Sequence, residues 1–393
     1  MSASTGRSSG RDALHPPRNG HPPFTGPVKI SFLYGITTRR LWRLLRENRW
    51  RVSPRYLPRL LLHALFSVWN SRVAAREERA YGAAIRQTSV ESDPLFVIGH
   101  WRGGTTHLHN LLAQDARFAA PKTFDVVFPA GFLSITERQR RLLGLMTPSA
   151  RPADNVAFGL DAPNEEELGL CQITTASPYL ALSFPHRAHH YSRFLDLQLT
   201  SEGERQEWRR AYRTFVQKLG YRYERRLLLK SPSNTGRVDE LLRLYPRARF
   251  VHIVRNPLAV YRSSLRLFQA LLWNHRLLLQ SFHPSGLPEL VIRNYEVMHR
   301  AYFRDCDAIP SGQLHRVHYE DLIRDPLGEI RKIYTALNLG PCEEVVPRIA
   351  SYLESIGDYR TNQYPPLDPK VATHLEQRWA TCFESWGYRA GAV

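Results

Sequence analysis

Four apolar residues run directly into a glycine-rich loop at Leu95-Phe-Val-Ile-Gly-His-Trp-Arg-Gly-Gly-Thr-Thr106. The apolar run is typical of a short buried strand, and Leu108, Leu111 and Leu112 recur at helical spacing just after the loop. A strand, a tight loop and a helix in this order begin a βαβ unit. The loop has the spacing of a phosphate-binding P-loop, but Thr105 stands where the usual lysine would be.

The loop can hold an anion without that lysine. Backbone N–H groups and the start of the following helix would point at the ligand. The hydroxyl groups of Thr105 and Thr106 add donors, and Arg102 brings a positive charge from inside the loop. The alternative interpretation is a tight turn that binds nothing.

Three further apolar runs, at residues 227–230, 250–254 and 314–319, are each followed by a segment with helical spacing, near residues 238–244, 258–272 and 327–337. Short strands that alternate with helices require parallel pairing and crossover helices. The predicted fold class is therefore α/β, a P-loop-like three-layer α/β/α arrangement with a central parallel sheet, plus N-terminal helices. Ligands of such sheets bind outside the carboxyl ends of the strands.

Cations follow the strands of this predicted sheet. Lys230 ends one apolar run and Arg255 follows another, so these two side chains and Arg102 are expected to converge on one crevice. A kinase would instead place an acidic residue there to hold magnesium. The pattern favours a polyanionic ligand that is bound without a metal.

Composition narrows the class of protein. The chain has 393 residues, 43% of them hydrophobic, and 54 Lys plus Arg against 36 Asp plus Glu, a formal net charge of +18. A chain of this kind buries a large core, which excludes global disorder. The four cysteines, at positions 171, 306, 342 and 382, form no zinc-site or disulfide pattern. The positive charge leaves open a basic module that binds nucleic acid or an anionic membrane, although the arginines form no motif.

Ordered motifs over roughly residues 94–339 resemble the sulfotransferases that use 3′-phosphoadenosine-5′-phosphosulfate (PAPS). Trp101-Arg-Gly-Gly-Thr-Thr106 is similar to that family's 5′-phosphosulfate loop, here in a bacterial-type form that reads G-H-W-R-G-G-T-T. Arg255 and, eight positions later, Ser263 match its 3′-phosphate motif. His318-Tyr-Glu-Asp-Leu322 is similar to its Y-E-D-L segment, whose tyrosine, here Tyr319, approaches the adenine.

The resemblance implies PAPS as co-substrate and no metal. The residues implied in binding it are Arg102, Gly103, Gly104, Thr105, Thr106, His107, Arg255, Ser263 and Tyr319. The loop residues would hold the 5′-phosphosulfate, and Arg255 and Ser263 would hold the 3′-phosphate. His107 falls where cytosolic relatives carry a tryptophan against the adenine.

The resemblance also implies catalytic residues. Lys230 falls where the family has a catalytic lysine, whose ammonium would stabilise charge on the leaving oxygen as the S–O bond breaks. The histidine base of many cytosolic relatives is replaced by Pro232. Because Asn164-Glu-Glu-Glu167 resembles an acidic segment of a bacterial branch, we expect Glu167, then Glu166, to remove the acceptor proton. The alternative is a solvated acidic start of a helix.

The predicted function is direct in-line transfer of a sulfuryl group from PAPS to a hydroxyl of an acceptor. Residues 122–158 and 268–288 would form the acceptor walls, and the apolar candidates there are Phe124, Phe128, Phe132, Trp273 and Phe282. This apolar lining favours a lipid or other amphiphilic acceptor. A nucleotide or small-molecule kinase and a basic binding module remain the alternatives.

Three regions are expected along the chain. Residues 1–27, rich in Ser, Gly, Pro and Arg, would form a disordered basic arm, residues 28–92 a helical extension, and residues 93–393 the sulfotransferase domain. The helices of the extension either cover the core, which we favour, or contact a membrane surface. No signal peptide or spanning segment is recognised, so we expect a cytoplasmic protein.

Overall fold

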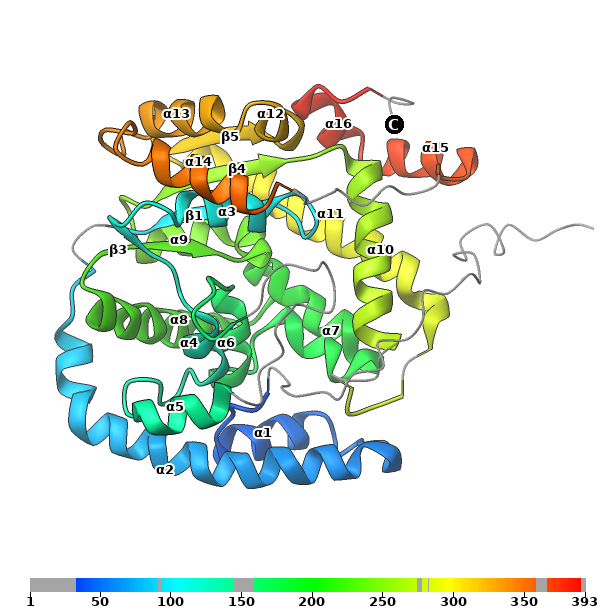
Figure 1. Ribbon diagram of the computed structural model, residues 1–393. Coiled ribbons are helices and arrows are strands. Elements are labelled where there is room, and N and C mark those ends of the chain that lie inside the picture. Colours follow the sequence, from blue (N-terminus) through cyan, green and yellow to red (C-terminus); the bar gives the residue numbers. More distant parts are fainter. Residues whose placement is uncertain are drawn as a thin grey trace, which may run out of the picture.

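The computed structural model describes residues 33–90, 93–144, 159–273, 278–281, 283–357 and 366–389. A five-stranded parallel sheet lies at its centre, in the order β2-β3-β1-β4-β5 (Figure 1). The strands are β1 (Leu95–Ile98), β2 (Phe118–Ala119), β3 (Arg226–Lys230), β4 (Arg249–Val254) and β5 (Leu314–His318). The sequence predicts four of them. It misses β2, because two residues are too few to form a pattern.

Helices surround the sheet. Those before β3 are α1 (Thr38–Glu47), α2 (Leu57–Gln87), α3 (Thr105–Leu112), α4 (Thr123–Val127), α5 (Glu137–Gly144), α6 (Glu166–Ile173), α7 (Ala188–Ser192) and α8 (Glu202–Tyr223). Those after it are α9 (Val238–Leu244), α10 (Pro257–Trp273), α11 (Leu287–Asp305), α12 (Tyr319–Arg324), α13 (Pro326–Ala336), α14 (Val346–Ser355), α15 (Pro369–Arg378) and α16 (Ala380–Trp386). A short 3-10 helix, η7 (Pro232–Arg237), follows β3.

Both faces of the sheet are buried, as the continuous apolar strands require. Phe96 and Ile98 of β1 belong to one core cluster, which also contains Phe215 of α8. Leu95 and Val97 belong to a second cluster on the opposite face, formed with helices that include α3 and α13. The three-layer α/β/α architecture with a central parallel sheet is thus confirmed.

The N-terminal helices lie side by side along the lower edge of the molecule in Figure 1. Leu41, Leu44 and Leu45 of α1 are buried in the main core, as expected of a helical cover. The apolar pattern of α2 also predicts that Leu61, Leu65 and Val68 face the core. This prediction is wrong, because all three side chains are exposed.

Polar contacts set the rotation of α2. Its buried positions include His63, Ser67 and Asn70. The side-chain amide of Asn70 donates to the carbonyl oxygen of Ile36 at 3.1 Å, and the hydroxyls of Ser67 and Thr38 lie 3.1 Å apart. These contacts fix the start of α1 and the segment before it. The polar residues therefore occupy the inner face together with Leu60 and Ala64, while Leu61 and Leu65 turn outward.

Residues 1–27, the predicted basic arm, lie outside the described residues, and the boundaries of the three predicted regions stay predictions. Within the described part of the chain, no helix is both long enough and apolar enough to cross a lipid bilayer.

Candidate active site

The glycine loop connects the carboxyl end of β1 to the start of α3. Gly99 and Gly104 have φ angles of +144° and +100°, a region that favours glycine. A Cβ atom at Gly104 would lie 2.4 Å from Cδ2 of Tyr319, so only glycine allows that ring to approach the loop. The backbone N–H of Gly103 donates to the carbonyl of His100 at 2.9 Å and closes the turn. The loop and α12 are therefore in direct contact.

Arg102 lies at the centre of a second set of contacts. Its own φ angle is +68°, which is unusual for a residue with a side chain. Its Nε donates to Oγ of Ser263 in α10 at 2.8 Å, and its carbonyl oxygen accepts from Nη1 of Arg255 at 3.1 Å. The Arg255 guanidinium lies 4.2 Å from the centroid of the Tyr319 ring. The structure thus brings together four predicted binding residues from four different elements.

Lys230 ends β3 beside the start of α3. Its side chain is only 1% exposed, and its Nζ lies 2.6 Å from Oε1 of Glu165 and 3.4 Å from Oγ1 of Thr106. The predicted lysine therefore contacts the predicted loop. It holds a carboxylate that the sequence prediction did not choose.

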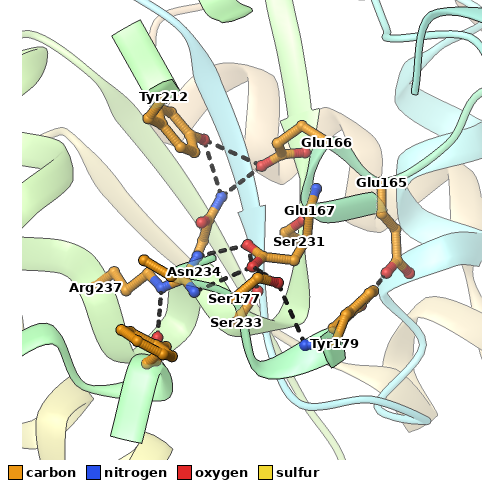
Figure 2. Close-up of polar contacts among 12 residues, drawn as sticks. Glu165, Glu166, Glu167, Ser177, Tyr179, Tyr212, Ser231, Ser233, Asn234 and Arg237 are labelled. Carbon is orange, nitrogen blue, oxygen red and sulfur yellow. Dashed lines mark hydrogen bonds and ion pairs between the residues drawn. The ribbon is translucent and has the colours of Figure 1, made fainter. Parts of the chain in front are cut away.

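Glu165 comes directly before α6, and its second oxygen accepts a hydrogen bond from the hydroxyl of Tyr179 (Figure 2). That hydroxyl in turn accepts from Nε1 of Trp101 at 2.9 Å. Burial, together with the negative charge of Glu165, raises the pKa of Tyr179 well above its usual value, so the phenol stays protonated. Trp101, Tyr179 and Lys230 together fix the orientation of the Glu165 carboxylate.

Glu167, the residue predicted as the base, lies in a sealed network. It is fully buried and accepts from Nη1 and Nη2 of Arg237 at 2.5 and 3.2 Å. The hydroxyls of Ser177 and Ser233 donate to the same carboxylate at 2.6 and 3.0 Å. Figure 2 shows that this group also contacts Tyr179, whose backbone N–H donates to Oγ of Ser177 at 3.3 Å. These contacts tie α6 to η7, and the role of Glu167 as base stays a prediction.

Glu166 is buried as well. Its carboxylate accepts from the Tyr212 hydroxyl at 3.1 Å, from Nδ2 of Asn234 at 2.5 Å and from the backbone N–H of Lys230 at 3.0 Å. Burial, to which the charge of Glu167 adds, raises the pKa of Glu166 to about 7. The side chain therefore holds the backbone of Lys230 at the end of β3.

A pattern in the sequence does not distinguish these three glutamates. Consecutive residues at a helix start point about 100° apart, so a run of identical residues faces several directions. The signal that separates them is long-range: Ser233, Asn234 and Arg237 follow Lys230 closely and donate to the two inner carboxylates. Oγ of Ser231 accepts from the backbone N–H of Glu167 at 3.1 Å. Glu165 is left nearest to the loop.

His107 is half-buried, and burial lowers its pKa, which keeps the ring neutral at pH 7. Phe124, Phe128 and Phe132 are buried in the main core, where Phe132 packs against Phe215, and their assignment to an acceptor wall stays a prediction. The side chain of Trp273 and all of Phe282 lie outside what the structure describes.

Other aromatic rings gather near Glu165. The ring centroids of Trp101 and Tyr179 are 6.0 Å apart, and those of Trp101 and Phe268 are 5.9 Å apart. Phe268 lies on α10, the helix that carries Ser263. Among the described residues, no three His, Cys, Asp or Glu side chains are grouped so that they could hold a metal ion.

The sequence of this chain is similar to the sequences of known proteins. Residues 94–344 match the model of a family described as the sulfotransferase family. Two relatives, from Mycobacterium bovis and Mycobacterium tuberculosis, carry the name omega-hydroxy-beta-dihydromenaquinone-9 sulfotransferase Stf3. Each is 33% identical over 346 residues, which covers 88% of this chain and 88% of the relative.

Two solved structures resemble the fold. Sulfotransferase STF1 from Mycobacterium tuberculosis H37Rv superposes with a TM-score of 0.61 at 19% identity, over 87% of this chain and 90% of that one. Sulfotransferase STF9 from Mycobacterium avium gives a TM-score of 0.61 at 18% identity, over 85% and 86%. At this identity the likeness concerns the fold alone.

Proposed function

Because the chain belongs to the sulfotransferase family, we propose that it transfers a sulfuryl group from PAPS to a hydroxyl of a lipid-like acceptor. The observation that carries this proposal is the ion pair between Lys230 and Glu165, which lies against Thr106 of the glycine loop. It supplies an ammonium and a carboxylate at one place. The name of the Stf3 relatives, a sulfotransferase of a hydroxylated menaquinone derivative, supports a lipid acceptor.

The set of donors around Arg102 fits the donor nucleotide. The Arg102 guanidinium donates to the Ser263 hydroxyl, and the Arg255 guanidinium donates to the backbone carbonyl of Arg102, so both cations lie at the loop, which suits a phosphate group. We assign Arg255 and Ser263 to the 3′-phosphate. Arg102 and the loop residues Gly103, Gly104, Thr105 and Thr106 take the 5′-phosphosulfate. We assign Tyr319 and His107 to contacts with the adenine ring.

We assign the role of general base to Glu165, in place of Glu167 and Glu166. A base must reach the proton that it removes, and Glu165 is the partly exposed member of the three, with 15% of its side chain accessible. The other two carboxylates are fully buried and accept hydrogen bonds from the protein.

In the proposed transfer, Glu165 takes the proton of the acceptor hydroxyl as that oxygen bonds to sulfur. Lys230 stabilises the negative charge that collects on the bridging oxygen as its bond to sulfur breaks. One S–O bond forms and another breaks in the same step, so the products are a sulfate ester and adenosine 3′,5′-bisphosphate. No sulfo-enzyme is formed.

The apolar rings suit such an acceptor. Tyr179 donates to the Glu165 carboxylate, and the ring of Trp101 lies between those of Tyr179 and Phe268 of α10, at centroid distances of 6.0 and 5.9 Å. We assign these three rings to the acceptor chain near its hydroxyl, in place of the phenylalanines predicted from the sequence. The kinase and the basic binding module are not supported as the main function of a member of this family.

The test is a calorimetric titration of adenosine 3′,5′-bisphosphate into the protein without magnesium, beside AMP and ATP. We expect micromolar binding that needs the 3′-phosphate. Arg255→Ala should abolish it, whereas Arg249→Ala, at the opposite end of the same strand, should not. Transfer of ³⁵S from labelled PAPS to lipid alcohols then tests the reaction. Binding that ignores the 3′-phosphate would exclude the proposed donor.

A further inference from the structure

The outward face of α2 has the opposite polarity to that of an ordinary surface helix. Leu57, Leu61, Leu65 and Val68 are 52%, 61%, 62% and 41% exposed, and they recur three or four residues apart, on one side of the helix. The opposite side holds the buried polar residues that bind the segment before α1. The leucines are therefore held outward by the fold. A set of exposed leucines on one face indicates an apolar partner.

Positive charge continues the same face. Arg72 and Arg76 follow Val68 at the same helical spacing, and both are exposed. From position 48 to position 76 the sequence contains six arginines and no Asp or Glu. We define the outer stripe of α2 as Leu57, Leu61, Leu65, Val68, Arg72 and Arg76. Its partner must be both apolar and negatively charged.

The layer that carries this stripe is the outermost one. In Figure 1, α2 runs along the lower edge of the molecule with α1 beside it. Trp42 and Trp50, in and just after α1, are 52% and 53% exposed. Indole rings prefer the boundary between lipid and water.

We propose that the outer stripe of α2 docks on the surface of an anionic lipid bilayer. An interfacial helix places leucines at the boundary of the acyl chains and arginines among the phosphate groups. A second copy of the chain is a poorer partner, because a symmetric contact would bring like charges together. The helix lies on the membrane in this arrangement and does not cross it.

The stripe is connected to the proposed active site. The segment after α10 is bonded to the residues before and at the start of α2: the N–H of Ser53 donates to the carbonyl of Leu279 at 2.9 Å, and Nη1 of Arg59 donates to that of Leu278 at 2.7 Å. Since α10 carries Ser263 and Phe268, docking would hold the active site at a fixed height above the membrane. This last step rests on the proposed function, whereas the docking itself does not.

The test measures flotation of the full chain with vesicles of phosphatidylcholine alone or mixed with phosphatidylglycerol, without nucleotide or acceptor. We expect binding to the anionic vesicles that weakens with salt. Leu61→Glu/Leu65→Glu should lower the affinity by at least about tenfold. Arg72→Gln/Arg76→Gln should lower it severalfold and reduce its salt dependence.

The matched control is Leu142→Glu/Leu199→Glu, which changes charge and polarity equally at leucines that are 59% and 54% exposed on other elements. It should bind as the unchanged protein does. Equal losses in the control and in the α2 variant would overturn the proposal. So would a lack of vesicle binding, or a dimer that light scattering shows to dissociate in Leu61→Glu/Leu65→Glu. Bisphosphate affinity, measured on the same variants, reports separately on the proposed function.

Discussion

Glu165 and Glu167 are two residues apart, yet their carboxylates have different surroundings. Glu165 pairs with Lys230 beside the loop and keeps part of its surface accessible, whereas Glu167 is sealed against Arg237 and two serines. A buried carboxylate with four donors is held for the stability of the fold. A partly exposed carboxylate can exchange a proton. The two roles differ in environment and not in residue type.

The largest expected effect concerns Glu165. Glu165→Gln keeps the size of the side chain but removes the basic oxygen, so kcat should fall by about 10² to 10⁴. The free energy of unfolding should fall as well, because Lys230 is 1% exposed and loses its charged partner, so kcat is taken per folded enzyme. Initial rates of sulfate ester formation, with circular dichroism on the same samples, measure both. A normal kcat in this variant would show that another group is the general base.

Glu167→Gln should act mainly on stability. Removing the negative charge leaves Arg237 buried without its partner, which should lower the free energy of unfolding by about 3–5 kcal/mol. The kcat of the folded fraction should change little. Denaturant unfolding measures the loss, and Glu289→Gln, which breaks a more exposed pair with Arg378, is the control with an expected cost below about 1 kcal/mol. If the two variants unfold alike, the network is not structural.

Lys230→Ala should lower kcat by about 10² to 10³, because the ammonium would act on charge that develops in the transition state. Affinity for adenosine 3′,5′-bisphosphate should change only slightly. Steady-state kinetics and calorimetry separate the two quantities. Lys332→Ala, which removes an exposed ammonium from a pair with Glu329, should change neither. If only nucleotide binding is lost, Lys230 acts in binding the nucleotide and not in the transfer step.

The smallest effect is a dependence of stability on pH. The pKa of Glu166 is raised to about 7 in the folded chain, above its ordinary value, so the folded state holds this proton more tightly. Stability from this group is present at low pH and is lost as pH rises through about 7, by roughly 3 kcal/mol. Glu166→Gln should remove this decline. Denaturant titrations at pH 5 and pH 8 measure the difference, and parallel declines in both proteins would contradict the assignment.

Short patterns in the sequence predicted most strands of the sheet and the glycine loop. Four strands and the glycine loop follow from short apolar runs and their flanking residues, and the loop does contact Tyr319. It was harder to predict which side of a helix each residue occupies. The choice among three glutamates depended on residues around Arg237, and the rotation of α2 depended on Asn70 and Ser67. In both cases, contacts between distant segments outweighed the periodicity.

The left-handed backbone of Arg102 has a consequence for heat resistance. A residue with a side chain pays about 1 kcal/mol or more for a φ angle of +68°, a cost that glycine avoids. Arg102→Gly should therefore raise the melting temperature while it weakens the bisphosphate complex, and thermal denaturation with and without nucleotide measures the exchange. The loop accepts a lower thermal stability because this backbone directs the Arg102 guanidinium. Selection for thermal stability alone would therefore favour glycine at position 102 at the expense of nucleotide binding.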